Sequence, residues 1–152
     1  SVHICGGRAK DELHAGQIDG LLMCCKRFQV NGRLEPAELI QICQRHPKHE
    51  VITQDRNDNI WLIDVEIDNH SLLIDASGGR GILPPRWERL QTEKRVGFAG
   101  GLGSHNLRGQ LPKIKEVAKP GWWIDMEASL RDEADWFDTE RALQVMEICL
   151  TF

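Results

Sequence analysis

Six short apolar runs recur along this chain at nearly constant intervals, and this recurrence limits the folds that the chain can adopt. The runs begin at Val2, Arg27, Val51, Ser71, Arg95 and Trp122, which gives steps of 25, 24, 20, 24 and 27 residues. Most runs are apolar on successive residues, as parallel strands covered on both faces are, whereas half-exposed strands alternate apolar and polar residues. The pattern therefore predicts about six βα units of a parallel α/β fold.

The segments between the runs carry helical periodicity. Leu39 and Cys43 lie four residues apart behind Pro36, and proline is favoured in the first turn of a helix. A second helix is predicted behind Ser104 as N-cap, with an apolar stripe of Leu107, Leu111, Ile114 and Ala118. A third is predicted behind Asp138, with a stripe of Ala142, Val145, Met146 and Cys149. Cys43 and Cys149 are expected to be buried, as free cysteines usually are. The sequence DRNDN at residues 55–59 indicates a polar loop.

Composition and charge narrow the class of protein. Hydrophobic residues make up 41% and charged residues 28% of 152 residues, as in soluble globular domains. No stretch approaches the roughly 20 apolar residues of a membrane span. Nineteen basic and 23 acidic residues give a formal charge of −4 with no basic run, so we expect neither nucleic-acid nor membrane binding. The length fits a single domain spanning residues 1–152, and five cysteines without a C-x-x-C pair predict reduced thiols and a cytoplasmic location.

Two glycine-rich sequences follow the fourth and fifth apolar runs. They are LLIDASGGRG at residues 72–81 and VGFAGGLG at residues 96–103. Glycine permits positive φ and lets backbone N–H groups approach an anion closely, and a helix N-terminus behind Ser104 adds a favourable dipole. The predicted anion-binding residues are Gly78, Gly79, Arg80, Gly81, Gly100, Gly101 and Ser104. The alternative is that these glycines only form tight loops.

The late position of the glycines distinguishes between two parallel α/β architectures. In a doubly wound sheet the glycine fingerprint normally follows the first strand. In a (β/α)₈ barrel the phosphate-binding loops follow the last strands. The sequence therefore favours a TIM-type barrel, which is incomplete because only about six units fit into its length.

These sequences resemble those of phosphoribosylanthranilate isomerase. Asp75 with the Gly-Gly-Arg-Gly that follows is similar to the family's sixth-strand motif, and FAGGL from Phe98 is similar to its seventh-strand phosphate loop. The WIDME sequence from Trp123 takes the place of the eighth strand, and FQVNG from Phe28 resembles the fourth-strand Gln-Leu-His-Gly. The resemblance implies a (β/α) barrel with strands equivalent to the third through eighth, N-terminally truncated by two βα units.

The resemblance also implies a chemistry, the Amadori-type rearrangement of a phosphorylated aminosugar. Asp75 takes the position of the general acid, which protonates the furanose ring oxygen as the ring opens. The alternative is that its carboxylate caps its own loop. The family's general base is a first-strand cysteine, and the strand count places no residue of this chain there. Cys5, at the end of the first apolar run, is the candidate, and His3 shares its face of the strand.

Several positions depart from the family pattern. Arg80 replaces the threonine of the sixth-strand loop, and Glu127 and Arg131 stand in a loop that usually faces phosphate. Together with Asp125 these two are predicted to line the substrate rim, and arginine suits bidentate anion binding. The alternative is an ion pair between Glu127 and Arg131 across the rim. Asp125 and Glu127 also have the spacing of magnesium ligands, but we expect no metal and no cofactor.

We therefore expect an isomerase-like enzyme acting on a small phosphorylated sugar derivative. The rival interpretation is a catalytically silent barrel remnant that binds a small anionic ligand or a protein partner. Either way, Asp75, Gly79, Gly101, Asp125 and Glu127 should converge on one rim, at the carboxyl ends of their strands. Because six strands leave unpaired edges, we expect either an open barrel or a homodimer in which a second copy of the chain closes the gap.

Overall fold

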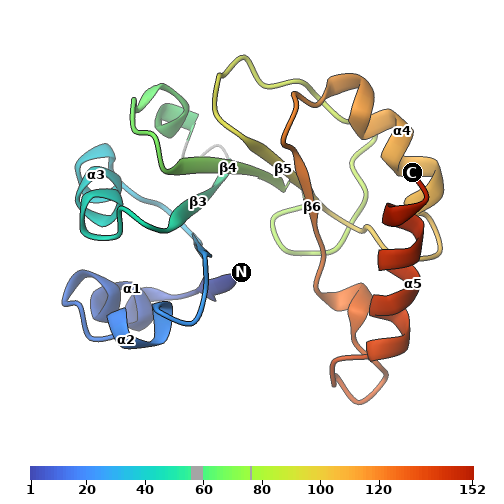
Figure 1. Ribbon diagram of the computed structural model, residues 1–152, viewed down its shortest axis with the longest axis horizontal. Helices are drawn as coiled ribbons and strands as arrows, with labels where there is room; N and C mark the ends of the chain where they lie inside the picture. Colours follow the sequence, from blue (N-terminus) through green and yellow to red (C-terminus); the bar gives the residue numbers. More distant parts are fainter. Residues whose placement is uncertain (56–59, 76) are drawn as a thin grey trace. The chain divides into compact units, whose positions relative to one another are not determined.

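A computed structural model describes residues 1–55, 60–75 and 77–152 of the chain (Figure 1). The described residues form six strands, one at each apolar run. These strands are β1 (Val2–Ile4), β2 (Arg27–Val30), β3 (Glu50–Asp55), β4 (His70–Asp75), β5 (Val96–Ala99) and β6 (Trp123–Asp125). They belong to one sheet in the order β1-β2-β3-β4-β5-β6. The pairs β1–β2, β2–β3, β3–β4 and β5–β6 are parallel. The prediction of a parallel α/β fold is thereby confirmed.

The chain divides into two compact units. The first comprises Ser1–Ile74 and Thr92–Arg95, and the second comprises Asp75–Gln91 and Val96–Phe152. The polar loop predicted at residues 55–59 starts at the last residue of β3, and its residues 56–59 lie outside the described residues. Among the helices of the described ranges, none has the length and apolarity that a membrane crossing requires.

Helices of the first unit pack on its strands through one apolar core. They are α1 (Gly7–His14), α2 (Asp19–Leu22), α3 (Pro36–Arg45) and a short 3₁₀ helix, η1 (Ile60–Asp64). The helix predicted behind Pro36 is confirmed, and it buries Leu39, Ile42 and Cys43 against β2 and β3. Glu35 and Glu38 form a reciprocal capping box at its start. Burial raises the pKa of the Cys43 thiol to about 12, which fits a packing role rather than a reactive one.

A group of polar side chains lies at the amino ends of the strands of the first unit, with Ser71 buried and Glu50 and Arg27 half-buried. Glu50, at the start of β3, accepts a hydrogen bond of 2.6 Å from the Ser71 hydroxyl and lies 3.1 Å from the Arg95 guanidinium. Arg27, at the start of β2, lies 3.3 Å from the same carboxylate. This ionic group links the amino ends of neighbouring strands, the end that serves stability rather than ligand binding in barrels of parallel strands.

The second unit combines β5 and β6 with α4 (Leu107–Val117), a 3₁₀ helix, η2 (Ala128–Leu130), and α5 (Thr139–Leu150). Helix α4 buries Leu107, Leu111 and Ile114 as predicted, and α5 lies beside it (Figure 1). Phe98 of β5 packs edge-on against Trp87 and Trp122, with ring centroids 5.8 Å and 6.4 Å apart. Gly97 makes room for the indole of Trp123, which a β-carbon at that position would overlap.

The buried face of α5 differs from the predicted stripe. Asp138 caps the helix as predicted, because its carboxylate accepts hydrogen bonds from the N–H groups of Glu140 and Arg141. The helix buries Val145 and Ile148, however, whereas Met146 and Cys149 are exposed. The expectation that Cys149 is buried was therefore wrong. Apolar residues occur on both sides of this helix, and periodicity alone does not select the side that faces the core.

Candidate functional site

Asp75 ends β4 and is almost fully buried, with 5% of its surface exposed. One carboxylate oxygen accepts hydrogen bonds from the Ser77 backbone N–H at 3.2 Å and the Ser77 hydroxyl at 2.8 Å. The other oxygen accepts a hydrogen bond of 2.6 Å from the Gly79 N–H. Asp75 therefore shapes the loop that follows it, as the loop-capping alternative proposes, and the side chain of Ser77 is a contributor that the glycine pattern did not single out.

The five glycines predicted to bind an anion all have positive φ. The values are 65° for Gly78, 82° for Gly79, 65° for Gly81, 120° for Gly100 and 61° for Gly101. Their surroundings differ, however. A β-carbon on Gly79 or Gly81 would meet nothing within 4 Å, whereas one on Gly101 would lie 2.6 Å from the Leu83 backbone nitrogen and 2.9 Å from the Gly81 carbonyl oxygen. The loops after β4 and β5 thus lie in direct contact, and Gly101 is the point where they meet.

Some backbone N–H groups of these loops donate hydrogen bonds within the protein, and others do not. The N–H groups of Gly78 and Gly79 donate to Asp75 and are not available to a ligand. Within the described part of the chain, the N–H groups of Arg80, Gly81 and Gly101 have no hydrogen-bond acceptor. The Arg80 side chain is exposed, and its Nε donates a 2.8 Å hydrogen bond to the Ser77 carbonyl. That bond orients the guanidinium, and its remaining N–H groups make no bond to the described residues.

The loop after β5 is held by Asn106 rather than by Ser104. The Asn106 side chain donates to the Gly101 carbonyl at 2.8 Å and accepts from the Gly103 N–H at 3.1 Å. Helix α4 begins at Leu107 with Asn106 as N-cap residue, so the prediction that Ser104 caps this helix was wrong. The Gly103 carbonyl accepts hydrogen bonds from both Asn106 and Leu107, which makes the intervening residues a turn that precedes the helix. The Ser104 N–H also has no acceptor among the described residues.

The loop after β6 joins the same rim through Ser129. Its hydroxyl donates a 2.5 Å hydrogen bond to the Leu102 carbonyl, and its β-carbon lies beside Gly103. Three successive loops, after β4, β5 and β6, are therefore in contact at the carboxyl ends of their strands. The sequence motifs indicated all three loops. Ser129, however, bonds to backbone 27 residues away, and no sequence pattern indicated that partner or the role of Asn106 within its own loop.

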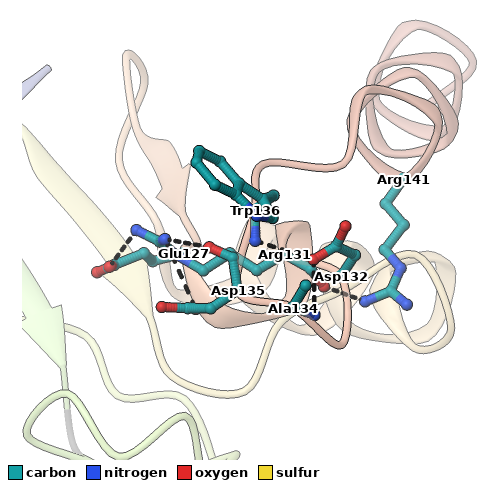
Figure 2. A network of polar contacts seen from close by, with 7 residues as sticks. All are labelled: Glu127, Arg131, Asp132, Ala134, Asp135, Trp136 and Arg141. Carbon is teal, nitrogen blue, oxygen red and sulfur yellow. Dashed lines mark hydrogen bonds and ion pairs between the residues drawn. The ribbon is translucent and has the colours of Figure 1, made fainter.

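Arg131 and Glu127 form the ion pair that was the alternative to ligand binding (Figure 2). The Arg131 guanidinium lies 3.1 Å from the Glu127 carboxylate, and it donates a 2.9 Å hydrogen bond to the Asp135 carbonyl. Asp132 accepts hydrogen bonds from the N–H groups of Ala134 and Trp136, which closes a tight loop (Figure 2). Asp125, at the end of β6, is half-buried. The charge of Arg131 is thus opposed by its neighbours, which leaves Arg80 as the better placed of the two predicted anion-binding arginines.

Cys5 belongs to the first unit and follows the last residue of β1. The exposed thiol accepts a 3.0 Å hydrogen bond from the Asn31 side-chain amide, and Asn31 in turn accepts one of 2.7 Å from buried Gln29. An amide does not take up a proton at neutral pH, so Asn31 orients the Cys5 sulfur but cannot serve as a base for its thiol. His3 is half-buried within β1. Among the residues that the structure describes, no three His, Cys, Asp or Glu side chains are placed to hold a metal ion.

Comparisons with known proteins give no match. No protein-family model, no curated protein and no solved structure is similar to this chain. The resemblance to phosphoribosylanthranilate isomerase thus stays a prediction from short motifs.

Proposed function

We propose that the three-loop rim of the second unit binds a small phosphorylated sugar derivative. The observation that carries the proposal is the grouping of unused donors on two glycine loops in contact, namely the N–H groups of Arg80, Gly81 and Gly101. The oriented guanidinium of Arg80 adds a positive charge next to them. Positive-φ glycines that present N–H groups in this way are typical of anion-binding loops, and arginine matches the oxygen geometry of phosphate.

The proposal includes the scaffold, an incomplete TIM-type barrel with strands equivalent to the third through eighth of phosphoribosylanthranilate isomerase. Its support is the recurrence of strands at nearly constant intervals, the parallel pairing within each unit, and the position of the glycine loops after the fourth and fifth strands. In barrels of this type ligands bind at the carboxyl ends of the strands, where the three loops lie.

For the chemistry we propose an Amadori-type rearrangement, with Asp75 as the acid that protonates the ring oxygen of the sugar. In this step the carboxyl proton passes to the ring oxygen, and the ring C–O bond breaks as the nitrogen lone pair forms a C=N bond. The products are a carboxylate and an open-chain iminium ion, which later loses a proton from the neighbouring carbon. A second candidate function, binding without turnover, is favoured by a specific observation. Both Asp75 oxygens already accept hydrogen bonds from their own loop, so acid catalysis requires that loop to release one of them.

Binding of the anion should depend on Arg80. We expect Arg80→Gln to weaken the binding of ribose 5-phosphate by about tenfold or more, because hydrogen bonds to a charged group contribute ~1.5–3 kcal/mol. Isothermal titration calorimetry with ribose 5-phosphate and with inorganic phosphate measures the effect. The matched control is Arg86→Gln, since Arg86 is an exposed arginine of the same connection that is paired with Glu88.

Equal affinities of Arg80→Gln and Arg86→Gln for both phosphates would overturn the proposed anion site. Inorganic phosphate bound as tightly as ribose 5-phosphate would keep the anion site but remove the sugar from the proposal. Turnover is a separate question, which an assay of aminosugar phosphate rearrangement answers. Binding with no turnover would favour the silent alternative.

The loop-capping geometry of Asp75 predicts a loss of stability on substitution. In Asp75→Asn only one oxygen remains, so the amide NH2 must face either the Gly79 N–H or the Ser77 N–H, both of which now donate to carboxylate oxygens. An unpaired buried donor costs ~1–3 kcal/mol, so we expect the free energy of unfolding to fall by about that amount in urea denaturation. Asp135→Asn is the control, because that side chain is exposed and lies 3.6 Å from its partner Arg131. Unchanged stability of Asp75→Asn with loss of turnover would instead favour acid catalysis over capping.

A further inference from the structure

Helix α5 has a second apolar face that the protein leaves exposed. Leu143, Met146 and Leu150 are three and four residues apart, a spacing that places them on one side of the helix. Their exposed fractions are 58%, 57% and 83%. The side that faces the interior of the unit is formed by Val145 and Ile148. A surface helix usually carries polar residues on the side away from the core, so three large apolar side chains there point to a binding surface.

An acidic edge borders this apolar stripe. Glu140 and Glu147 lie three and four residues from Leu143, so both stand on the same side of the stripe. The basic residue of α5, Arg141, is already engaged, since its guanidinium lies 3.1 Å from the Asp138 carboxylate. It also donates a hydrogen bond to the Arg131 carbonyl (Figure 2). The helix therefore presents apolar side chains together with negative charge.

The whole formal charge of the chain is concentrated in the same region. Residues 131–152 hold six acidic and two basic residues, a net charge of −4. The remaining chain holds 17 acidic and 17 basic residues and is balanced. A field of one sign at one part of a surface steers partners of the opposite sign toward it.

We propose that this face of α5 binds a basic amphipathic helix of a partner protein. The apolar side of such a helix covers Leu143, Met146 and Leu150, and its lysine or arginine residues pair with Glu140 and Glu147. A second copy of this chain fits less well, because an antiparallel pair of α5 helices sets the acidic edges against each other and a parallel pair sets them against Ala142 and Cys149. Anionic lipid and nucleic acid are repelled by the charge. The inference uses no residue of the glycine loops and is independent of the proposed function.

The test uses the full chain and two labelled peptides of about 18 residues, long enough to form a helix on binding. Both carry leucine at helical amphipathic spacing, one with lysine and the other with glutamate at the remaining positions. Fluorescence anisotropy should show binding of the lysine peptide and at least tenfold weaker binding of the glutamate peptide. Met146→Gln and the double variant Glu140→Gln/Glu147→Gln should each weaken binding about tenfold.

Two matched control variants distinguish peptide binding at this face of α5 from unspecific hydrophobic or electrostatic binding elsewhere on the protein. Met23→Gln changes an equally apolar, 81% exposed side chain of the first unit, and Glu133→Gln removes an exposed acid outside α5. Both should keep affinity within twofold, and thermal melting should show that every variant is folded. The inference is overturned if the lysine peptide does not bind, if the controls weaken binding as much as the α5 variants, or if sedimentation shows a dimer that Met146→Gln dissociates.

Discussion

Replacement of Gly101 by alanine is expected to lower the free energy of unfolding by about 3–4 kcal/mol, a large share of the ~5–15 kcal/mol that holds a typical domain. Two causes add. The φ of 61° is unfavourable for any residue with a β-carbon, at a cost of roughly 1–2 kcal/mol. The new β-carbon would also lie 2.6 Å from the Leu83 nitrogen, and backbone cannot turn aside as a flexible side chain can. Forcing an extra carbon into a packed contact costs ~1–3 kcal/mol.

Gly81→Ala is the matched control for this prediction. Its φ of 65° is nearly the same, but a β-carbon there has open space around it. We expect a loss of about 1 kcal/mol from backbone strain alone. Urea denaturation of both variants, compared with the unchanged protein, measures the difference, which reports the contact between the loops. If Gly101→Ala and Gly81→Ala were equally stable, the loops after β4 and β5 would not pack against each other in solution.

The close packing at Gly101 also changes how that glycine should be used in experiments. A charged residue there, such as Gly101→Asp, would place a carboxylate in the anion site, but it would first separate the two loops. Loss of ligand binding in such a variant would not distinguish repulsion from misfolding. Arg80 is the sharper probe, because its side chain is exposed and the Asp75 carboxylate holds the loop through Ser77 and Gly79.

The strands were predictable because each one is short, most contain successive apolar residues, and each is separated from the next by a segment of about 14–23 residues. A strand buried on both faces leaves a continuous apolar run, and this signal does not depend on knowing its neighbours. The buried side of α5 was not predictable in the same way. Val145 and Ile148 face the interior while Met146 does not, and this choice is made by packing of the whole unit. Local periodicity measures apolar spacing and contains no information on which side is covered.

In the candidate site, too, some features were predictable from the local sequence and others depend on tertiary contacts. Glycine-rich motifs after β4 and β5 indicated the place of the rim, because positive φ is a local requirement that the sequence displays directly. The roles of individual residues there depend on contacts between loops. Leu83 lies too close to Gly101 to leave room for a β-carbon there. The Asn106 side chain donates a hydrogen bond to the Gly101 carbonyl, and the Ser129 hydroxyl donates one to the Leu102 carbonyl. These partners are distant in the sequence or appear only when the loop is folded, so composition and spacing do not reveal them.

The second large effect expected is a loss of stability in mild acid, and its source is His70. This histidine starts β4 and is 3% exposed. Its Nε2 lies 2.8 Å from the Thr53 hydroxyl, and its other ring nitrogen has no partner among the described residues. Burial, with a smaller effect of the Lys94 charge, lowers the pKa of His70 from 6.5 to about 3. The folded protein therefore keeps the ring neutral at pH values where the unfolded chain binds a proton.

The sign of the pH effect follows from these two values. Because the folded-state pKa lies below the unfolded one, His70 favours folding fully above pH 6.5 and loses that contribution as the pH falls toward 3. Each pH unit in this window corresponds to about 1.36 kcal/mol. Between pH 7.5 and pH 4.5 only the two units below 6.5 count, so the expected loss is about 2.7 kcal/mol. Burial also lowers the pKa of His46, against the opposing charge of Asp19, so a further loss in acid is independent of His70.

Comparison with His70→Gln isolates the contribution of His70. Glutamine can still bond to the Thr53 hydroxyl but cannot take up a proton, and the effect of His46 remains in both proteins. Urea denaturation at several pH values between 7.5 and 4.5 gives the two slopes of stability against pH. The variant is expected to be less stable at neutral pH, because a new side chain replaces a packed ring, but its slope should be flatter by about 1.36 kcal/mol per unit below pH 6.5. Parallel slopes would mean that His70 binds its proton equally well in the folded and unfolded chains. That result would contradict its burial at the start of β4.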